Sequence, residues 1–269
     1  MKNNNSLGKR MKKYEYVSRT YLTRKIPIII RLDGKAFHTF CKGLFKPFDA
    51  ILIKSMQETA KYLCENIQGC KVAYVQSDEI TLLITDFENI DTEAWFEYNI
   101  QKMISISASM ATLAFNISFN KNVENYFSTN YLKNDRVENI KDQKEIYESK
   151  FNRALFDSRV FSLPKEEVCN CFIWRQQDAT RNSIQMLGQA NFSHKQLQKK
   201  SCSDIQDMLI KKDINWNNLR STLKRGSCII KKQIILNDII RNKWIIDDDI
   251  PIFSKDRQYI EKFLSKEDK

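Results

Sequence analysis

The sequence predicts an α+β fold whose elements follow the order β-α-β-β-α-β, the ferredoxin-like plan, before a mainly helical C-terminal region. Three observations lead to this prediction. Runs of β-branched or alternating apolar residues occupy 26–34 and 156–163, as is typical of strands. Two apolar runs in 71–84 meet at a short polar turn, which predicts a β-hairpin. Segments with apolar residues at helical spacing lie between these runs.

The first strand and the hairpin are both predicted to present acidic residues. The strand 26–34 begins near Pro27, where a missing N–H costs least, and it ends at Asp33 and Gly34. The hairpin turns at Gln76-Ser77-Asp78-Glu79. If the strands lie side by side, Asp33 and Asp78 face one another at the same edge of an antiparallel sheet.

Two helices are predicted to cover this sheet. One runs from Pro47 to about residue 68, with Gly69 as its C-terminal cap. The second runs from about 93 to 120. Residues 121–150 are polar and charged, which predicts an insertion or mobile connection with short helices at most. The strand 156–163 then completes the plan.

Beyond residue 164 the pattern becomes mainly helical. One helix is predicted over 165–188, and shorter amphipathic helices over 193–232. Residues 225–230 resemble a late strand, and a strand, a turn and a charged terminal helix end the chain. The late strand is predicted without any assignment of its partner.

The chain of 269 residues is basic, and its positive charge is concentrated in two stretches. The net charge is +11, from 44 Lys and Arg against 33 Asp and Glu. Residues 1–30 contain eight basic side chains and one acidic side chain. Residues 195–232 contain ten basic and three acidic side chains. Such clustering suits a polyanion, either nucleic acid or a membrane surface. A solvated lysine-rich face in a chain rich in Lys, Asn and Ile is the alternative.

Cysteine and histidine usage argues against a zinc site. The seven cysteines form no Cys-x-x-Cys pair, and the two histidines, His38 and His194, lie far from the closer cysteine pairs. We therefore expect free thiols in a reducing cytosol. Residues 1–15 have no apolar stretch of the kind found in secretory signals, and no apolar run approaches the roughly eighteen residues of a membrane span. The sequence predicts a cytoplasmic protein with no membrane segment.

Asp33, Asp78 and Glu79 are the candidate catalytic and metal-binding residues. Hard cations such as Mg²⁺ prefer carboxylate oxygens, and a pair of ions can activate an attacking hydroxyl and stabilise a leaving phosphate. Asp33 and Asp78 would bridge two such ions. Glu79 is adjacent to Asp78 on the strand and should point the other way, so a structural role is its alternative. Solvated turn residues are the alternative for the whole set.

Four cations near these acids have two open interpretations. Arg31, Lys35 and Lys46 suit a triphosphate, or they are solvated surface charges. Arg175 suits a phosphate, or it pairs internally with Asp178.

Three uncharged or weakly basic residues are equally open. Phe37 and His38 suit stacking on a nucleobase or packing in the core. Ser77 suits a hydrogen bond to a nucleotide, or it caps the hairpin turn.

Five blocks of residues resemble one enzyme family in their order and spacing. They are Arg31-Leu32-Asp33-Gly34-Lys35-Ala36-Phe37-His38, Lys46-Pro47-Phe48-Asp49, Gln76-Ser77-Asp78-Glu79, Phe156-Asp157-Ser158-Arg159-Val160 and Trp174-Arg175-Gln176-Gln177-Asp178. Together they resemble the tRNA-histidine guanylyltransferase family, including its bacterial, phage and archaeal guanylyltransferase-like branch. The resemblance covers about residues 20–232.

The resemblance implies a fold and an activity. A polymerase- or cyclase-like palm would occupy 1–164, with a basic lead-in and an insertion near 121–150, and 165–269 would contact tRNA. The enzyme would be a nucleotidyltransferase that extends the 5′ end of tRNA in the 3′-to-5′ direction, with two Mg²⁺ ions per active site. ATP would adenylylate the 5′-monophosphate, and the 3′-hydroxyl of GTP or another nucleoside triphosphate would displace AMP. Family members form homotetramers, as dimers of dimers.

The resemblance also implies roles for individual residues. Metal ligands fall on Asp33, the Gly34 carbonyl and Asp78, with Glu79 beside them. Nucleotide binding falls on Lys35, Ala36, Phe37, His38, Lys46 and Ser77. Contacts with tRNA or phosphate are predicted for basic and polar residues of the blocks and of the C-terminal basic stretch: Arg31, Arg175, Asn182, Lys199, Lys200, Lys211 and Arg225.

One block departs from the family pattern. Eukaryotic members carry His-Ile-Asn-Asn-Leu-Tyr-Asn after the Trp-Arg-Gln-x-Asp motif, whereas residues 180–186 read Thr-Arg-Asn-Ser-Ile-Gln-Met. The guanylyltransferase-like branch shares this loss, which favours template-dependent repair of 5′-truncated tRNA over addition of one guanosine to tRNA-His. A nucleotide cyclase and a non-catalytic RNA-binding module are the more distant hypotheses.

Overall fold

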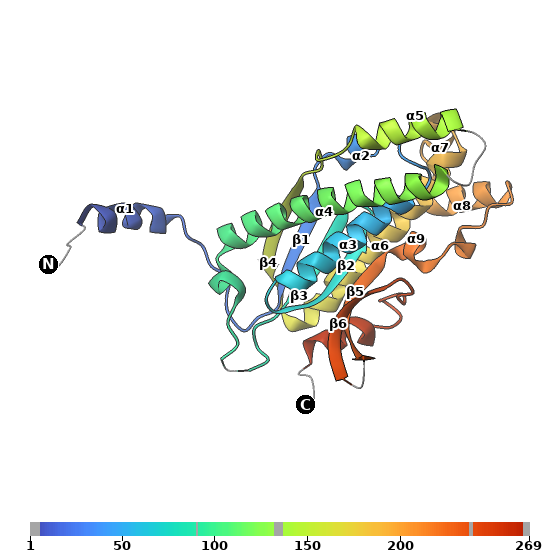
Figure 1. Ribbon diagram of the computed structural model, residues 1–269. Helices are drawn as coiled ribbons and strands as arrows, with labels where there is room; N and C mark the ends of the chain where they lie inside the picture. Colours follow the sequence, from blue (N-terminus) through green and yellow to red (C-terminus); the bar gives the residue numbers. More distant parts are fainter. Residues whose placement is uncertain (1–5, 90, 132–136, 237–238, 266–269) are drawn as a thin grey trace.

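A single antiparallel sheet forms the centre of the molecule (Figure 1). The computed structural model describes residues 6–89, 91–131, 137–236 and 239–265. Within these ranges the strand order is β4-β1-β3-β2-β5-β6. The strands are β1 (Ile28–Gly34), β2 (Cys70–Gln76), β3 (Glu79–Ile84), β4 (Phe156–Ser162), β5 (Ser227–Leu236) and β6 (Ile239–Asp247).

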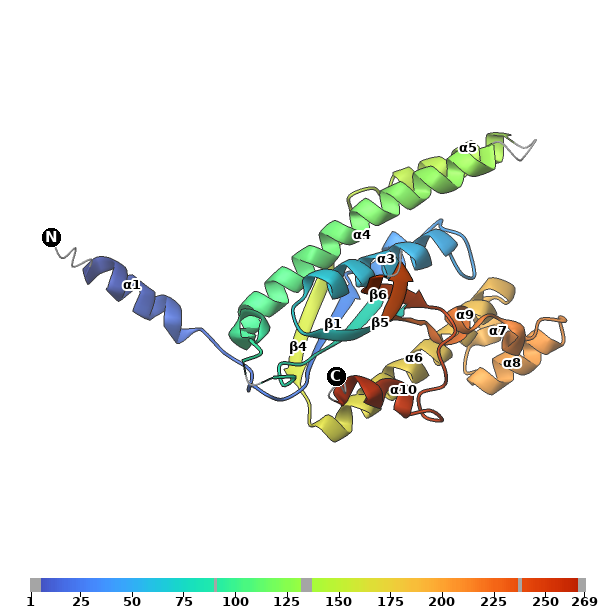
Figure 2. The same ribbon diagram turned by 60° about the horizontal axis from the view of Figure 1, so that its bottom comes forward.

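Long helices cover both faces of the sheet. Helices α3 (Ala50–Asn66) and α4 (Ile100–Tyr131) lie over one face, and α6 (Lys165–Asn191) lies over the other (Figures 1 and 2). The alternation of side chains along β1 explains both layers, because successive strand residues point to opposite faces. Ile28 and Ile30 join the core cluster under α3 and α4, whereas Ile29 joins the cluster under α6.

Shorter elements surround this sandwich. They are α1 (Ser6–Val17), α2 (Phe37–Phe40), η1 (Trp95–Tyr98), α5 (Val137–Glu148), α7 (His194–Leu197), α8 (Cys202–Ile210), η2 (Trp216–Asn218), α9 (Ser221–Arg225), α10 (Gln258–Glu261) and η3 (Lys262–Leu264). Helix α1 has no buried residue and extends away from the rest of the molecule (Figure 2). None of the helices described is long and apolar enough to cross a bilayer.

The predicted fold class is confirmed. The first four strands, with α3 and α4, follow the order β-α-β-β-α-β, and their order in the sheet is β4-β1-β3-β2. In the polar segment 121–150 the short helices that the sequence allowed are present, since α4 continues to Tyr131 and α5 follows at Val137–Glu148, while residues 132–136 lie outside the described residues. Val123, Phe127 and Tyr147 are buried there, so a few inward apolar residues fix helices in an otherwise polar sequence.

The region after residue 164 also contributes strands. Strand β5 pairs with β2 through residues 72–75 and 227–230, and β6 pairs with β5 along its whole length. The late strand expected at 225–230 is therefore present and has the hairpin strand β2 as its neighbour. Because the sheet continues across residue 164, the proposed division into two domains stays a prediction.

Candidate active site

The ends of β1 and of the β2–β3 hairpin bring Asp33 and Asp78 together. The backbone N–H of Gly34 donates to the carbonyl oxygen of Asp78 at 3.0 Å and so joins the two strand ends. Burial raises the pKa of Asp78 to about 6, and the nearby charge of Asp33 adds to the rise. Burial also raises the pKa of Asp33, with a contribution from Asp157, its neighbour on β4. These two carboxylates therefore interact at the tip of the hairpin.

The chemistry of this tip suits a hard cation. The donors at Asp33, Gly34 and Asp78 are all oxygens, as Mg²⁺ prefers. A divalent cation would also offset the repulsion by Asp33, which adds to the effect of burial in raising the pKa of Asp78. Within the described ranges, no cluster of three His, Cys, Asp or Glu residues forms. Mg²⁺ is commonly held by one or two carboxylates together with substrate phosphates, and the pair of acids matches that arrangement.

Glu79 is held by two arginines. Its Oε1 accepts a hydrogen bond from Nε of Arg175 at 2.6 Å, and its Oε2 lies 3.7 Å from Nε of Arg31. Arg175 also donates to Asp178 at 2.7 Å, and both arginines lie against the ring of Trp174. Glu79 and Arg175 are 5% and 6% exposed. Of the two interpretations given for each residue, the geometry favours the structural one for Glu79 and the internal ion pair for Arg175.

Gly34 and the ring of Phe37 pack against each other next to Asp33. A Cβ at Gly34 would lie 2.3 Å from Cδ2 of Phe37, so no side chain fits at that position. Phe37 is 3% exposed and packs on Phe40 and Phe156, which favours the core interpretation for its ring. His38 is exposed, so its ring remains available to a ligand.

A cavity of about 400 Å³ opens next to Asp78. Its walls come from α2 and the loop that follows it, from the hairpin tip, and from α6 near Met186. Of the predicted nucleotide-binding residues, Phe37, His38, Lys46 and Ser77 line it. Lys35 and Ala36 are exposed just before α2 and are not among the lining residues. The size and the mixture of apolar and cationic walls suit a nucleotide.

The loop of this cavity is fixed by Asp49, the N-cap of α3. Its Oδ1 accepts from the backbone N–H of Leu52 at 2.7 Å, and its Oδ2 accepts from that of Phe45 at 3.1 Å and from the hydroxyl of Tyr147. Burial and this bond raise the pKa of Tyr147. The sequence analysis missed both roles. An acid directly before a helical run is an N-cap signature that would have found Asp49.

The thiol of Cys41 lines the same cavity. Burial raises its pKa to about 12, and the charges of Asp78 and Asp49 contribute. The thiol therefore stays protonated at neutral pH and acts as an apolar part of the wall.

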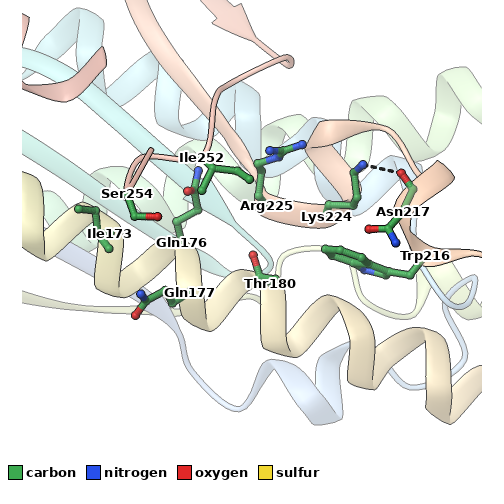
Figure 3. A pocket seen from close by; sticks show the side chains of 10 residues that line it. All are labelled: Ile173, Gln176, Gln177, Thr180, Trp216, Asn217, Lys224, Arg225, Ile252 and Ser254. Carbon is green, nitrogen blue, oxygen red and sulfur yellow. Dashed lines mark hydrogen bonds between the residues drawn. The ribbon is translucent and has the colours of Figure 1, made fainter. Parts of the chain in front are cut away.

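A second pocket lies between α6 and the segment that holds η2 and α9 (Figure 3). Trp216 and Lys224 form one side of it, and Thr180 lies on the α6 side. The ammonium of Lys224 donates to the carbonyl oxygen of Asn217 at 2.7 Å and lies 5.8 Å from the centre of the Trp216 ring. This cation already has partners within the protein.

The residues predicted to contact tRNA fall into separate places. Lys199 and Lys200 lie between α7 and α8, Lys211 follows α8, and all three are exposed. Asn182 and Arg225 instead line a small cavity with Ser77, next to the hairpin tip. The first group is a surface, and the second belongs to the candidate active site.

Comparison with known proteins identifies the family. A model of the tRNAHis guanylyltransferase family matches residues 8–164, more than half of the chain. The chain belongs to the tRNAHis guanylyltransferase family. The resemblance inferred from the five sequence blocks is thus confirmed.

Members of the guanylyltransferase family with known structure have the same architecture. A bacterial tRNA(His) guanylyltransferase-like protein in complex with ATP is 45% identical, with a TM-score of 0.80 over 96% of this chain and 99% of that chain. A protein of the same type in complex with GTP is 43% identical, with a TM-score of 0.77 over 97% of this chain and 99% of that chain. The tRNA(His) guanylyltransferase of Debaryomyces hansenii is 25% identical over 82% of this chain and 80% of that relative.

Proposed function

We propose that this protein extends the 5′ end of tRNA in the 3′-to-5′ direction and repairs 5′-truncated tRNAs with the opposite strand as template. The observation that carries the proposal is the meeting of Asp33 and Asp78 at a hairpin tip that borders a nucleotide-sized cavity. Membership of the guanylyltransferase family supports nucleotidyl transfer as the reaction class.

The proposed reaction has two steps. The 5′-phosphate of the tRNA attacks the α-phosphorus of ATP and releases pyrophosphate, and the 3′-hydroxyl of the incoming nucleoside triphosphate then displaces AMP. Two Mg²⁺ ions held by Asp33, the Gly34 carbonyl and Asp78 would lower the pKa of the attacking hydroxyl and neutralise charge on the leaving phosphate. The ATP and GTP complexes of the bacterial relatives support these nucleotides as substrates.

The chain itself would bind and orient the nucleotide. The exposed ring of His38 can lie on a base, and the ammonium group of Lys46 can meet a phosphate in the cavity. Lys35 is exposed just before α2 and would meet a phosphate outside the cavity lining. Glu79 would act by holding Arg175 and Arg31 under the hairpin, which keeps Asp78 in place.

The altered block 180–186 supports repair over single addition. Asn182 and Met186, on α6, line the spaces beside Ser77, so this block borders the site in which a nucleotide would be chosen. Pairing with the opposite strand would select the base, and the protein would need only to hold the backbone and the phosphates. Addition of one guanosine to tRNA-His is the alternative, because eukaryotic relatives carry that activity in their names. The homotetramer and the cytoplasmic location remain parts of this proposal.

The proposal is tested with a tRNA that lacks its first 5′ nucleotide. The protein is incubated with this tRNA, Mg²⁺, ATP and all four nucleoside triphosphates, with Asp33→Ala as the inactive control. Extension by the complementary nucleotide, stopping at full length, is expected. Addition of guanosine alone, to tRNA-His alone, would establish the alternative. Failure to extend either tRNA would reject both, and cyclic product from a nucleotide without RNA would indicate a cyclase.

A further inference from the structure

A small cavity of about 80 Å³ lies beside the cavity of about 400 Å³ that borders Asp78, which we call the nucleotide cavity. The two cavities share Asp49, Leu52, Ser77 and Met186. We call the small cavity the hairpin slot. Its polar lining residues include Gln76, Ser77, Asn182 and Arg225, and apolar side chains such as Ile53, Met186 and Leu223 also line it. A water molecule takes about 30 Å³ of liquid, so the slot has the size of two or three waters or of one phosphate group. It is too small for a nucleoside.

Gln76 is one of the residues that line this slot. Its side chain is 5% exposed, and its Oε1 is buried with no hydrogen-bond partner in the described part of the chain. A buried polar atom without a partner is costly, and most such atoms in native proteins are satisfied by protein, water or ligand. The two ends of an amide are interchangeable by rotation, so the same position can present an N–H donor to an anion.

Arg225 lines the same slot and also borders the pocket of Figure 3. Its Nε is buried without a hydrogen-bond partner, and its Nη2 has a 3.5 Å contact to the hydroxyl of Ser221. Among the residues that the structure describes, no carboxylate lies within ion-pair distance of it. The acid in the slot lining, Asp49, is already bound by Leu52, Phe45 and Tyr147. A half-buried guanidinium is normally paired with an anion. Because no carboxylate of the described residues pairs with Arg225, we expect an anion of the ligand to fill this place.

The backbone holds Arg225 next to the catalytic hairpin. Val75 on β2 pairs with Ser227 on β5, so the two residues before Ser227 run alongside the hairpin tip. The Arg225 carbonyl accepts from the hydroxyl of Tyr74 at 2.7 Å. Gly226 has φ +78°, and a Cβ there would lie 2.3 Å from the carbonyl oxygen of Val75. Close packing of the two strands therefore fixes the position from which the guanidinium projects.

We propose that the hairpin slot binds a phosphate group of the substrate, with Arg225 and Gln76 as its principal donors and Ser77 and Asn182 at its side. This inference rests on the proposed function. Guanidinium, amide and hydroxyl groups all donate hydrogen bonds to phosphate oxygens, and the charged guanidinium of arginine makes the strongest of these bonds. The phosphate comes either from the 5′ end of the RNA or from the nucleoside triphosphate, since both react at Asp33 and Asp78.

The neighbouring Lys224 provides a matched control. It precedes Arg225 on α9 but does not line the slot. Its ammonium donates to the carbonyl oxygen of Asn217 and lies near Trp216 in the pocket of Figure 3, which Arg225 also borders. Lys224→Gln removes the same charge from the same helix without changing the slot. A general loss of positive charge would affect both variants equally, whereas a phosphate site would respond to Arg225 alone.

The test measures binding of each ligand alone, so that no turnover is possible. One arm compares tRNA with a 5′-phosphate and a 5′-hydroxyl, and the other compares ATP with adenosine, each for wild type, Arg225→Gln, Gln76→Met and Lys224→Gln. We expect Arg225→Gln to reduce the preference for the phosphorylated ligand at least tenfold in one arm, which identifies the source of the phosphate. Gln76→Met should reduce it less and should keep or raise the Tm, because it removes an unpaired buried amide.

Unchanged phosphate preference in both arms, in a folded Arg225→Gln protein, would overturn the inference. An equal loss in Lys224→Gln would overturn it as well, and a lower Tm for Gln76→Met would remove Gln76 from the site. Because binding is measured without extension, these results are independent of the repair assay. Loss of the proposed function alone would leave the phosphate preference intact.

Discussion

The hydroxyl of Tyr147 hydrogen-bonds the carboxylate of Asp49 across 98 residues of sequence, and so ties α5 to the first turn of α3. Tyr147→Phe keeps the ring and removes this bond. We expect unfolding in urea to show a loss of about 1–1.5 kcal/mol. The KM for ATP should rise while kcat changes little, because the loop that lines the nucleotide cavity loses one of its anchors. Glu145→Ala, exposed on the same helix, is the control and should match wild type. Wild-type stability in Tyr147→Phe would mean that this bond does not hold the loop.

Replacement of either acid at the hairpin tip should stop the reaction. Asp33→Ala or Asp78→Ala removes one of the two carboxylates proposed to hold Mg²⁺, a loss of several kcal/mol in transition-state stabilisation, or on the order of 10³-fold in rate. Single-turnover extension and tRNA binding by filter retention measure the two effects separately. Binding should remain within about threefold of wild type. Weak binding with full residual turnover would contradict the assignment.

The pKa of about 6 for Asp78 predicts a pH-dependent stability of the metal-free protein. A raised pKa means that the folded state binds this proton more tightly than the unfolded state, for which the ordinary value is 3.8. The stabilisation is therefore complete below about pH 4 and is lost as the pH rises through 6. The difference of about two pKa units corresponds to about 3 kcal/mol. In EDTA, Asp78→Asn should be more stable than wild type at pH 8 and equal to it at pH 4. Parallel curves of Tm against pH would contradict this.

The two interpretations of Glu79 lead to different results for Glu79→Gln. The structural interpretation predicts a loss of about 3–5 kcal/mol, because Arg175 would keep a buried charge with one of its two partners gone. The dependence of the remaining activity on Mg²⁺ concentration should be unchanged. Denaturant unfolding and a Mg²⁺ titration measure both quantities. Wild-type stability with a much higher Mg²⁺ midpoint would make Glu79 a metal ligand. Glu124→Gln, exposed on α4, controls for loss of charge.

The exposed lysines between α7 and α8 should contribute to tRNA affinity through charge alone. Replacing Lys199 and Lys200 with alanine should weaken binding and reduce the slope of log K against log salt by about one for each lost phosphate contact. Turnover at saturating tRNA should stay the same. Lys61→Ala, on α3, is the comparison and should leave the slope unchanged. An unaltered slope in the double variant would place the tRNA elsewhere.

Local sequence patterns were sufficient to predict that Asp33 and Asp78 meet. A strand that ends in an acid and a hairpin with an acidic tip leave few ways to build an antiparallel sheet. The same patterns could not assign a partner to β5. The alternation of apolar residues along a strand indicates which side chains share a face of the sheet, but it does not indicate which strand lies next to it. The link between Tyr147 and Asp49 was missed for a related reason: a single buried residue in a polar segment produces no periodic signal.

Roles of single side chains were predictable only where backbone direction decides them. Glu79 follows Asp78 on the strand, and the alternation of strand residues already suggested that it points away. The sequence predicts a short helix or turn at residues 35–40, and α2 is present there. Phe37 and His38 are adjacent on α2, yet one is buried and the other exposed, because the local sequence does not decide which side of so short a helix faces the core. Among the described residues, Oε1 of Gln76 and Nε of Arg225 are buried without a hydrogen-bond partner. The two residues are brought together by the pairing of β2 with β5, which no local stretch of sequence reveals.

The pairing of β5 with β2 has a consequence for how the protein is made. Until Ser227–Leu236 has left the ribosome, β2 is an edge strand with unpaired N–H and C=O groups, and such edges promote association between chains. The hairpin that carries Asp78 is translated early, but β5, which pairs with its strand β2, is translated late. During most of synthesis the exposed edge of β2 must therefore not pair with strands of other chains. A product truncated before residue 227 would retain Asp33 and Asp78 together with an open edge, and we expect it to aggregate.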